Sequence, residues 1–266
     1  MTLVILRLFL SLTSATAQIP ALAYSVPQLD CARFLETSES KILTQSGGRT
    51  RRQTSARRGR WQFRAAQSGP DLTLEAWLDS LAITRRSEET AISPDTDGLL
   101  GGRYRGALSQ TGDYTAHIQP FVPDEVAEVA GMAHALDDFF PRLPGRALGE
   151  GEMWADSLGM TIRRLPDSAA LGARLQRFDL KERETLRAAP AITDTLPLAV
   201  RQRSAETGRF VWHPRLGLLR RERAIVIETT VPPSRSVRQA VRSKVEQRIT
   251  LVRDLSPPRC ENSDAP

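Results

Sequence analysis

Cysteine is scarce in this sequence, which contains two such residues among 266. Cys31 and Cys260 lie near opposite ends of the chain. In an oxidising compartment an even number of cysteines favours pairing, so we predict one structural disulfide between Cys31 and Cys260. The alternative is two unbonded thiols in disordered ends. A chain of this length can bury a large core, so its stability does not require a metal.

Lysine, histidine and aromatic residues are also rare. Only three of the 37 basic residues are lysine, and the other 34 are arginine, a bias typical of GC-rich coding. The net charge of +6 would suit nucleic acid, but aromatic residues make up only 6% and do not interleave with the basic ones as in a nucleic-acid groove. His117, His134 and His213 stand far apart and form no zinc-binding pattern. We therefore predict no nucleic-acid partner, no metal and no cofactor.

Catalytic and calcium-binding motifs are missing as well. Asp95, Asp97 and Gly98 begin like an EF-hand loop, but Gly106 stands where a bidentate glutamate is needed. We interpret this segment as a turn in which Asp side chains bind backbone N–H groups and Gly98 has a positive φ. No G-x-S-x-G elbow or dinucleotide-binding fingerprint occurs. An enzyme is thus disfavoured, although a site assembled only by folding would escape this test.

Apolar runs long enough to cross a bilayer are missing too. The nearest approach is residues 1–17, where Arg7 and a short apolar run precede Ala-Thr-Ala at 15–17, a pattern typical of a secretory signal peptide cleaved before Gln18. A second such tripeptide at 21–23 leaves the cleavage site open. The sequence predicts an exported protein that is periplasmic or secreted and not transmembrane, with too few aromatic residues for the two girdles of an outer-membrane barrel.

Period-2 alternation of apolar and polar residues dominates the rest of the chain. It is clearest over 72–79, and residues 104–108 and 114–118 flank a turn-forming sequence, which predicts a hairpin. Further strands are predicted at 61–64, 153–164, 175–186, 196–203, 209–212, 218–231 and 236–253. One segment differs, because apolar residues from Asp124 to Phe140 follow spacings of three and four, which predicts an amphipathic helix that Pro141 ends.

These patterns predict a mainly β (α+β) fold. We expect a curved antiparallel sheet, like a barrel or half-barrel, whose concave side is covered by the helix or filled by a ligand. We predict an extended N-terminal segment over 18–44 and a single β-rich domain over 45–255. Two meander halves could divide that domain near 141–150, and residues 256–266 form a C-terminal tail.

Gly151, Glu152, Met153 and Trp154 form a G-x-x-W sequence at the start of a predicted strand. This opening resembles that of uncharacterised exported bacterial β-rich domains, over a few dozen residues. The resemblance implies a secreted domain of unknown role and transfers no functional residues. Physically, Gly151 allows a tight turn, and Trp154 is expected to fill the core rather than to form a stacking platform.

Function is therefore argued from class rather than from a motif. The first hypothesis is a non-catalytic binding or envelope-associated protein, whose partner is a lipid-like or small apolar ligand or an envelope protein. The alternative is a secreted or periplasmic hydrolase whose site no motif reveals. Arginine clusters at 49–60 and 235–253 would form solvated strand faces, or would meet anionic polymers or lipid headgroups in a salt-dependent manner.

Overall fold

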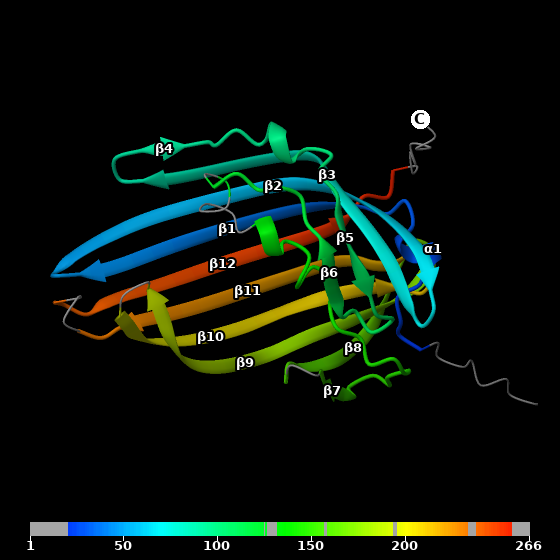
Figure 1. Cartoon of the computed structure of the whole chain (residues 1–266). Coiled ribbons are helices and arrows are strands. Elements are labelled where there is room, and N and C mark those ends of the chain that lie inside the picture. The colour runs from blue at the N-terminus through cyan, green and yellow to red at the C-terminus, as the bar shows by residue number, and fades with distance from the viewer. Residues whose placement is uncertain are drawn as a thin grey trace, which may run out of the picture.

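The computed structural model describes residues 21–124, 126, 132–156, 159–193, 196–233 and 238–256. Within them the chain forms one antiparallel sheet in the order β6-β5-β3-β2-β1-β12-β11-β10-β9-β8-β7, and the short β4 pairs with β3. The sheet is long and curved and is not closed between its outer strands β6 and β7 (Figure 1). The predicted mainly β, antiparallel, half-barrel fold is confirmed.

The elements follow one another as a simple meander. Their bounds are α1 Val26–Leu29, β1 Arg33–Ser46, β2 Arg49–Ser68, β3 Asp71–Ser87, β4 Ala91–Ile92, β5 Tyr104–Leu108, β6 Tyr114–Ile118, β7 Met153–Ala155, β8 Thr161–Ala170, β9 Ala173–Thr193, β10 Leu196–His213, β11 Gly217–Val231 and β12 Val241–Arg253. Short 3₁₀ helices lie at Asp97–Leu99 and Met132–His134. The hairpin predicted at 104–108 and 114–118 is present with those bounds as β5 and β6.

Strand β1 lies in the middle of the sheet, between β2 and β12. Its register runs from Phe34 opposite Arg253 to Ser46 opposite Val241. The predicted lead-in over 18–44 therefore does not match the structure, because it contains α1 and most of a central strand. The apolar–polar alternation that would predict a strand is weak in β1, because the polar residues Glu36 and Ser38 occupy inward positions that are usually apolar.

The core lies against one half of the sheet, which we call the proximal half because it is the half near α1. Phe34, Trp61 and Phe63 point to one face, here called the inner face, and are fully buried. The connector, residues 119–152 between β6 and β7, crosses this face and contributes the buried Phe139 and Phe140 (Figure 1). The ring of Phe139 lies 5.0 Å from that of Phe63, centroid to centroid, and the connector closes the core by such aromatic contacts.

The amphipathic helix predicted from Asp124 to Phe140 is wrong in its second half. Met132–His134 is a 3₁₀ helix, and turns follow from Ala135 to Phe139. Neighbouring residues on an α-helix project about 100° apart, yet Phe139 and Phe140 both enter one aromatic cluster with Phe63. Tight turns deliver both rings to the core where a regular helix would leave one outside. Residues 125 and 127–131 lie outside the described residues.

The other half of the same sheet, here the distal half, extends beyond the connector. It comprises β1 after Ser38, β2 before Arg57, β11 after Arg223 and β12 before Ile249, with the strands that pair with them. None of the described side chains in these four segments is fully buried. The distal half is thus a single layer whose inner face is open.

Trp154 in β7 is half-buried and packs against the core, as predicted, and Gly151 sits in the preceding turn with φ 79°. The described residues contain no helix with the length and apolar character needed to cross a membrane.

Candidate functional site

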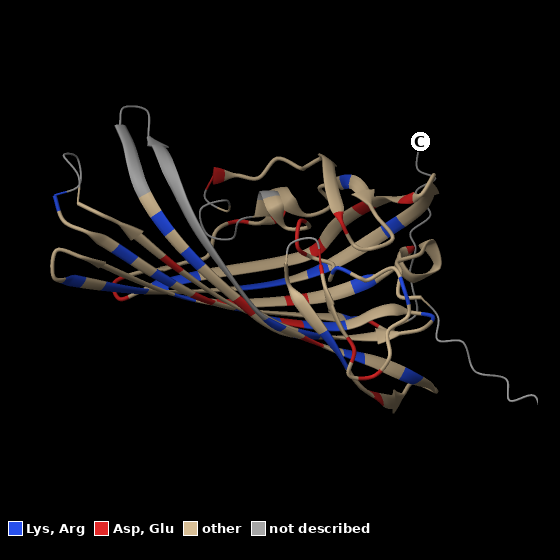
Figure 2. Cartoon of the chain, turned by 90° about the horizontal axis from the view of Figure 1, so that it is seen from below, with Lys and Arg blue, Asp and Glu red and all other residues tan. Residues whose placement is uncertain are grey.

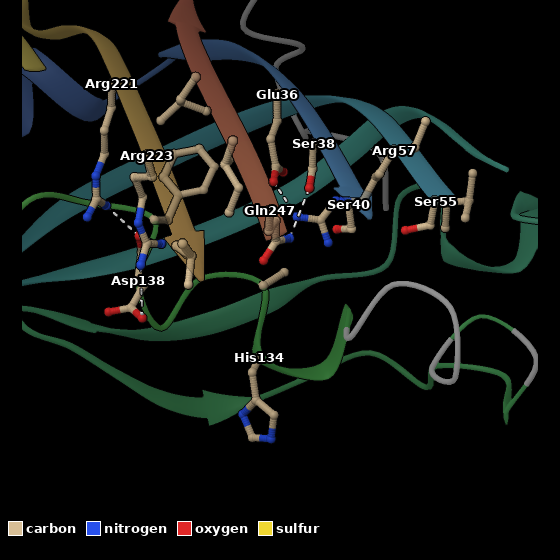
Figure 3. Close-up of a pocket in the computed structure, with 17 residues that line it drawn as sticks. Glu36, Ser38, Ser40, Ser55, Arg57, His134, Asp138, Arg221, Arg223 and Gln247 are labelled. Carbon is tan, nitrogen blue, oxygen red and sulfur yellow. Dashed lines mark hydrogen bonds and ion pairs between the residues drawn. The ribbon is translucent and has the colours of Figure 1, made fainter. Parts of the chain in front are cut away.

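A pocket of about 400 Å³ opens on the inner face, at the edge of the area that the connector covers (Figure 3). Its floor comes from strands β1, β2, β3, β11 and β12, and its wall from connector residues His134, Ala135, Asp138 and Phe139. It lies on the border between the covered proximal half and the open distal half. Three arginines line it together with aliphatic side chains, namely Arg57, Arg221, Arg223, Ile83, Ile225, Ile249 and Leu251.

Glu36 and Arg57 form an ion pair on one side of the pocket. Glu36 in β1 is buried, and its second carboxylate oxygen accepts a hydrogen bond of 2.7 Å from Nε1 of Trp61. Nη1 of Arg57 lies 3.3 Å from Sδ of Met132 in the connector. A buried carboxylate needs such partners, so this group fixes the connector to the sheet and leaves Glu36 no unmet charge.

Arg223 in β11 is paired with two acids. Its guanidinium donates to both carboxylate oxygens of Glu206, with Nε–Oε1 at 2.5 Å and Nη2–Oε2 at 2.9 Å. The same guanidinium reaches Asp138 of the connector at 3.5 Å. These carboxylates raise the pKa of Arg223 against the opposing effect of burial. Arg223 is thus a structural cation that holds β10, β11 and the connector together.

Arg221, two residues earlier on the same face, is different. It is buried, and its guanidinium donates to the backbone carbonyl of Asp138. Among the described residues no carboxylate lies within ion-pair distance of it, and its Nε has no hydrogen-bond partner. Burial and the nearby Arg223 lower the pKa of Arg221 to about 10, so the group is still cationic at neutral pH. A buried cation with an unused donor beside a pocket suits an anionic ligand group.

The pocket also contains hydroxyl groups and a histidine. Ser38 accepts a hydrogen bond of 3.0 Å from Nε2 of Gln247, and His134 lies 3.0 Å from Asp137 with its side chain 75% exposed. Within the described residues no hydrogen bond joins a serine to a histidine here. The nucleophile-and-base geometry of a serine hydrolase is not assembled at this pocket.

Beyond the pocket, the inner face continues as rows of side chains across β1, β12 and β11. Residues directly opposite one another across the three strands form six such rows: Glu36/Leu251/Arg221, Ser38/Ile249/Arg223, Ser40/Gln247/Ile225, Ile42/Val245/Ile227, Thr44/Ser243/Thr229 and Ser46/Val241/Val231. All nine residues of the first three rows line the pocket. The fourth row, which we call the aliphatic row, is wholly apolar and only half-buried. Along the open face the pocket rows are thus followed by one aliphatic row, then by a row of hydroxyl side chains and a mixed row.

The structure brings none of the predicted site residues into this pocket. Cys31 lies in the turn after α1, at the proximal end, and Cys260 lies outside the described residues. Arg33 lies at the same corner, where its Nη2 donates to the carbonyl of Ser256 at 3.0 Å. The last described residue, Ser256, therefore contacts Arg33. Arg33 is two residues after Cys31 in sequence, and Ser256 is four residues before Cys260.

The predicted turn at Asp95 is present in part. Oδ1 of Asp95 accepts a 2.9 Å hydrogen bond from the backbone N–H of Asp97. Gly98 lies in a 3₁₀ helix and lacks the predicted positive φ, which Gly101 has instead. The described residues contain no cluster of three or more histidine, cysteine or acidic side chains that could hold a metal ion.

Sequence reasoning missed the pocket arginines. The signal that could have found them is a charged residue at an inward position of an alternating strand. Glu36 is such a residue, two positions after the buried Phe34. Arg221 and Arg223 are others, on the face that they share with Leu251 and Ile249. Among 34 arginines this signal is visible only when the register of neighbouring strands is known.

No protein-family model matches the chain, and no curated protein matches it. A DUF1329 family protein from Desulfovibrio piger is 8% identical over 84% of this chain and 87% of its own, with a TM-score of 0.17. A putative outer membrane lipoprotein-sorting protein domain from Vibrio parahaemolyticus is 9% identical over 87% of this chain and 89% of its own, also with a TM-score of 0.17. Similarity at this level supports no conclusion about function.

Proposed function

We propose that the protein is a non-catalytic binding protein of the cell envelope, periplasmic or secreted, and that its ligand is an elongated anionic amphiphile. The observation that carries this proposal is the border position of the pocket. Arg221, which is buried and has no carboxylate within ion-pair distance among the described residues, lines the pocket, and the half-buried aliphatic row Ile42, Val245 and Ile227 lies on the inner face just beyond it. The export assignment follows from the signal-peptide pattern at residues 1–17.

The distances along the strands suit such a ligand. Arg221 and Ile227 are six residues apart in β11, which corresponds to about 20 Å at roughly 3.3 Å per residue. An anionic group at Arg221 would supply the negatively charged partner that this cation lacks among the described residues. An apolar chain lying towards the distal half would remove the aliphatic row from solvent, at roughly 25 cal/mol per Å² of apolar surface buried.

The test is calorimetric titration of the full chain with dodecanoate, and with dodecanol as its uncharged counterpart. We expect dodecanoate to bind more tightly than dodecanol, because only the carboxylate pairs with Arg221. Replacing Ile227 by Asp places a charge beside the chain, and should weaken dodecanoate binding at least tenfold, about 1.4 kcal/mol.

The matched control is Val226→Asp. Val226 precedes Ile227 in β11, is also half-buried, and points to the opposite face of the sheet. It should bind dodecanoate like the parent protein. Equal loss in both variants, or no binding of either probe, would contradict the proposal. The hydrolase alternative has no specific observation in its favour among the described residues.

A further inference from the structure

The distal end of the sheet carries a second feature that ligand binding does not use. Seven exposed arginines gather on the hairpin tips there, and we call them the basic rim: Arg49, Arg51, Arg52, Arg86, Arg201, Arg238 and Arg242. Figure 2 shows basic residues along the strand ends away from α1. The register brings four strands to one level, because Arg201 is opposite Thr230, Thr230 is opposite Arg242, and Arg242 is opposite Gln45.

The rim arginines differ from several arginines of the proximal half in their partners. Proximal arginines such as Arg57, Arg164 and Arg209 are paired with carboxylates. For the seven rim arginines, the described part of the chain supplies no ion pair and no side-chain hydrogen bond. The described residues of segments 43–54 and 229–245 contain no acid, and the β3–β4 turn adds only Glu88 and Glu89. The rim therefore carries seven arginines against these two acids, which line a small pocket together with Arg51 and Arg52.

Apolar groups stand next to the rim. Ile92 in β4 is 52% exposed and lies opposite Arg85, next to Arg86. Val231 and Val241 form the last row of the inner face, so the open face that starts at the pocket ends between the rim arginines. A surface that combines several free guanidinium groups with exposed aliphatic side chains matches the headgroup region of an anionic bilayer.

We propose that the basic rim docks the protein, distal end first, on a membrane surface rich in anionic lipid headgroups. The open end of the inner face would then meet the source or destination of an amphiphile directly. Guanidinium groups bind phosphate oxygens through paired N–H donors, and the attraction is long-range and screened by salt. This proposal concerns a surface separate from the pocket and does not depend on whether dodecanoate binds there.

The experiment is co-sedimentation of the full chain with vesicles of phosphatidylcholine alone, or of phosphatidylcholine with 30% phosphatidylglycerol. We expect binding to the anionic vesicles only, and a steep loss of binding when salt rises from about 50 to 300 mM. The triple variant Arg49→Gln/Arg51→Gln/Arg52→Gln should weaken vesicle binding roughly a hundredfold, at about fivefold for each arginine near the surface.

The matched control removes the same charge elsewhere, in Arg163→Gln/Arg174→Gln/Arg177→Gln. These arginines are exposed on β8 and β9, outside the rim. This variant should lose only a few-fold in vesicle binding, and Ile227→Asp should bind vesicles like the parent protein. Equal losses in the two triple variants would overturn the proposal, because net charge alone would then explain binding. Preference for soluble dextran sulfate over the anionic vesicles would also overturn it, in favour of a polymeric partner.

Discussion

The same central strands run through the proximal and distal halves of the sheet, but the residues that they turn to the inner face differ in size and aromatic character. In β1 the inward positions hold Phe34 in the proximal half and Ile42 and Thr44 in the distal half. The proximal rings are covered by the connector, whereas the distal aliphatic residues stay half-buried on an open face. Alternation therefore specifies which face turns inward. The size and aromatic character of the inward residues specify how far a second layer extends.

The largest expected difference between the halves is in their contribution to stability. Phe139→Ala removes a ring that contacts Phe34, Trp61 and Phe63, and should cost about 3–5 kcal/mol of the free energy of unfolding. Ile227→Ala in the open half should cost less than about 2 kcal/mol, because that side chain is only partly buried. Urea unfolding of both variants measures this, and equal losses would mean that the distal face is covered in solution.

A second difference concerns covalent linkage, which is predicted only at the proximal end. Reduction of the predicted Cys31–Cys260 disulfide should lower the free energy of unfolding by roughly 2–4 kcal/mol. Thermal unfolding with and without reductant measures the effect, and peptide mapping under non-reducing conditions identifies the bond. A Cys31→Ser/Cys260→Ser variant should be insensitive to reductant. A parent protein that ignores reductant would contradict the prediction and return the cysteines to unbonded thiols.

The smallest expected effect is the pH dependence of a proximal turn. Nδ1 of His213 accepts backbone hydrogen bonds of 3.0 Å from both Arg215 and Leu216, which requires that nitrogen to be unprotonated. Burial, with the charges of Arg215 and Arg253, lowers the pKa of His213. The unfolded chain then binds a proton more readily than the folded one, so stability should fall as pH drops below about 6.5 and be complete above it.

His213→Asn tests this assignment, because an Asn side-chain oxygen can accept the same backbone N–H groups without titrating. Unfolding followed between about pH 5 and 7 should show a smaller loss on acidification in the variant than in the parent protein. Identical profiles would show that another group governs the acid side.

The fold was predictable where one strand carries its own signal. Alternation and the turn between Leu108 and Tyr114 predict the β5–β6 hairpin with its observed bounds, since adjacent strands need only local information. The central strand β1 was not predicted, because Glu36 and Ser38 interrupt its inward face, and the partners that satisfy them come from distant parts of the chain. Its place between β2 and β12 is a tertiary fact that no local pattern contains.

The candidate site was less predictable for the same reason. Arg221 is one arginine among 34 in sequence, and only the register with Leu251 and Glu36 shows that it faces inward. The second half of the predicted helix, from Met132 to Phe140, was also mispredicted because its apolar spacing fits a helix. The pairing of Phe139 with Phe140 in one cluster required tight turns that tertiary packing selects.

The pairing of β1 with β12 has a consequence for biosynthesis. Both meanders can form from neighbouring hairpins, but the seam between them joins Phe34 to Arg253, so it waits until the last strand has left the ribosome. Until then the seam-facing side of β1 presents unpaired N–H and C=O groups, the kind of edge at which nascent chains associate with one another. We expect refolding yields to fall with protein concentration. In a circular permutant opened between β6 and β7, the two central strands β12 and β1 would be synthesised one after the other, and this dependence on concentration should be weaker.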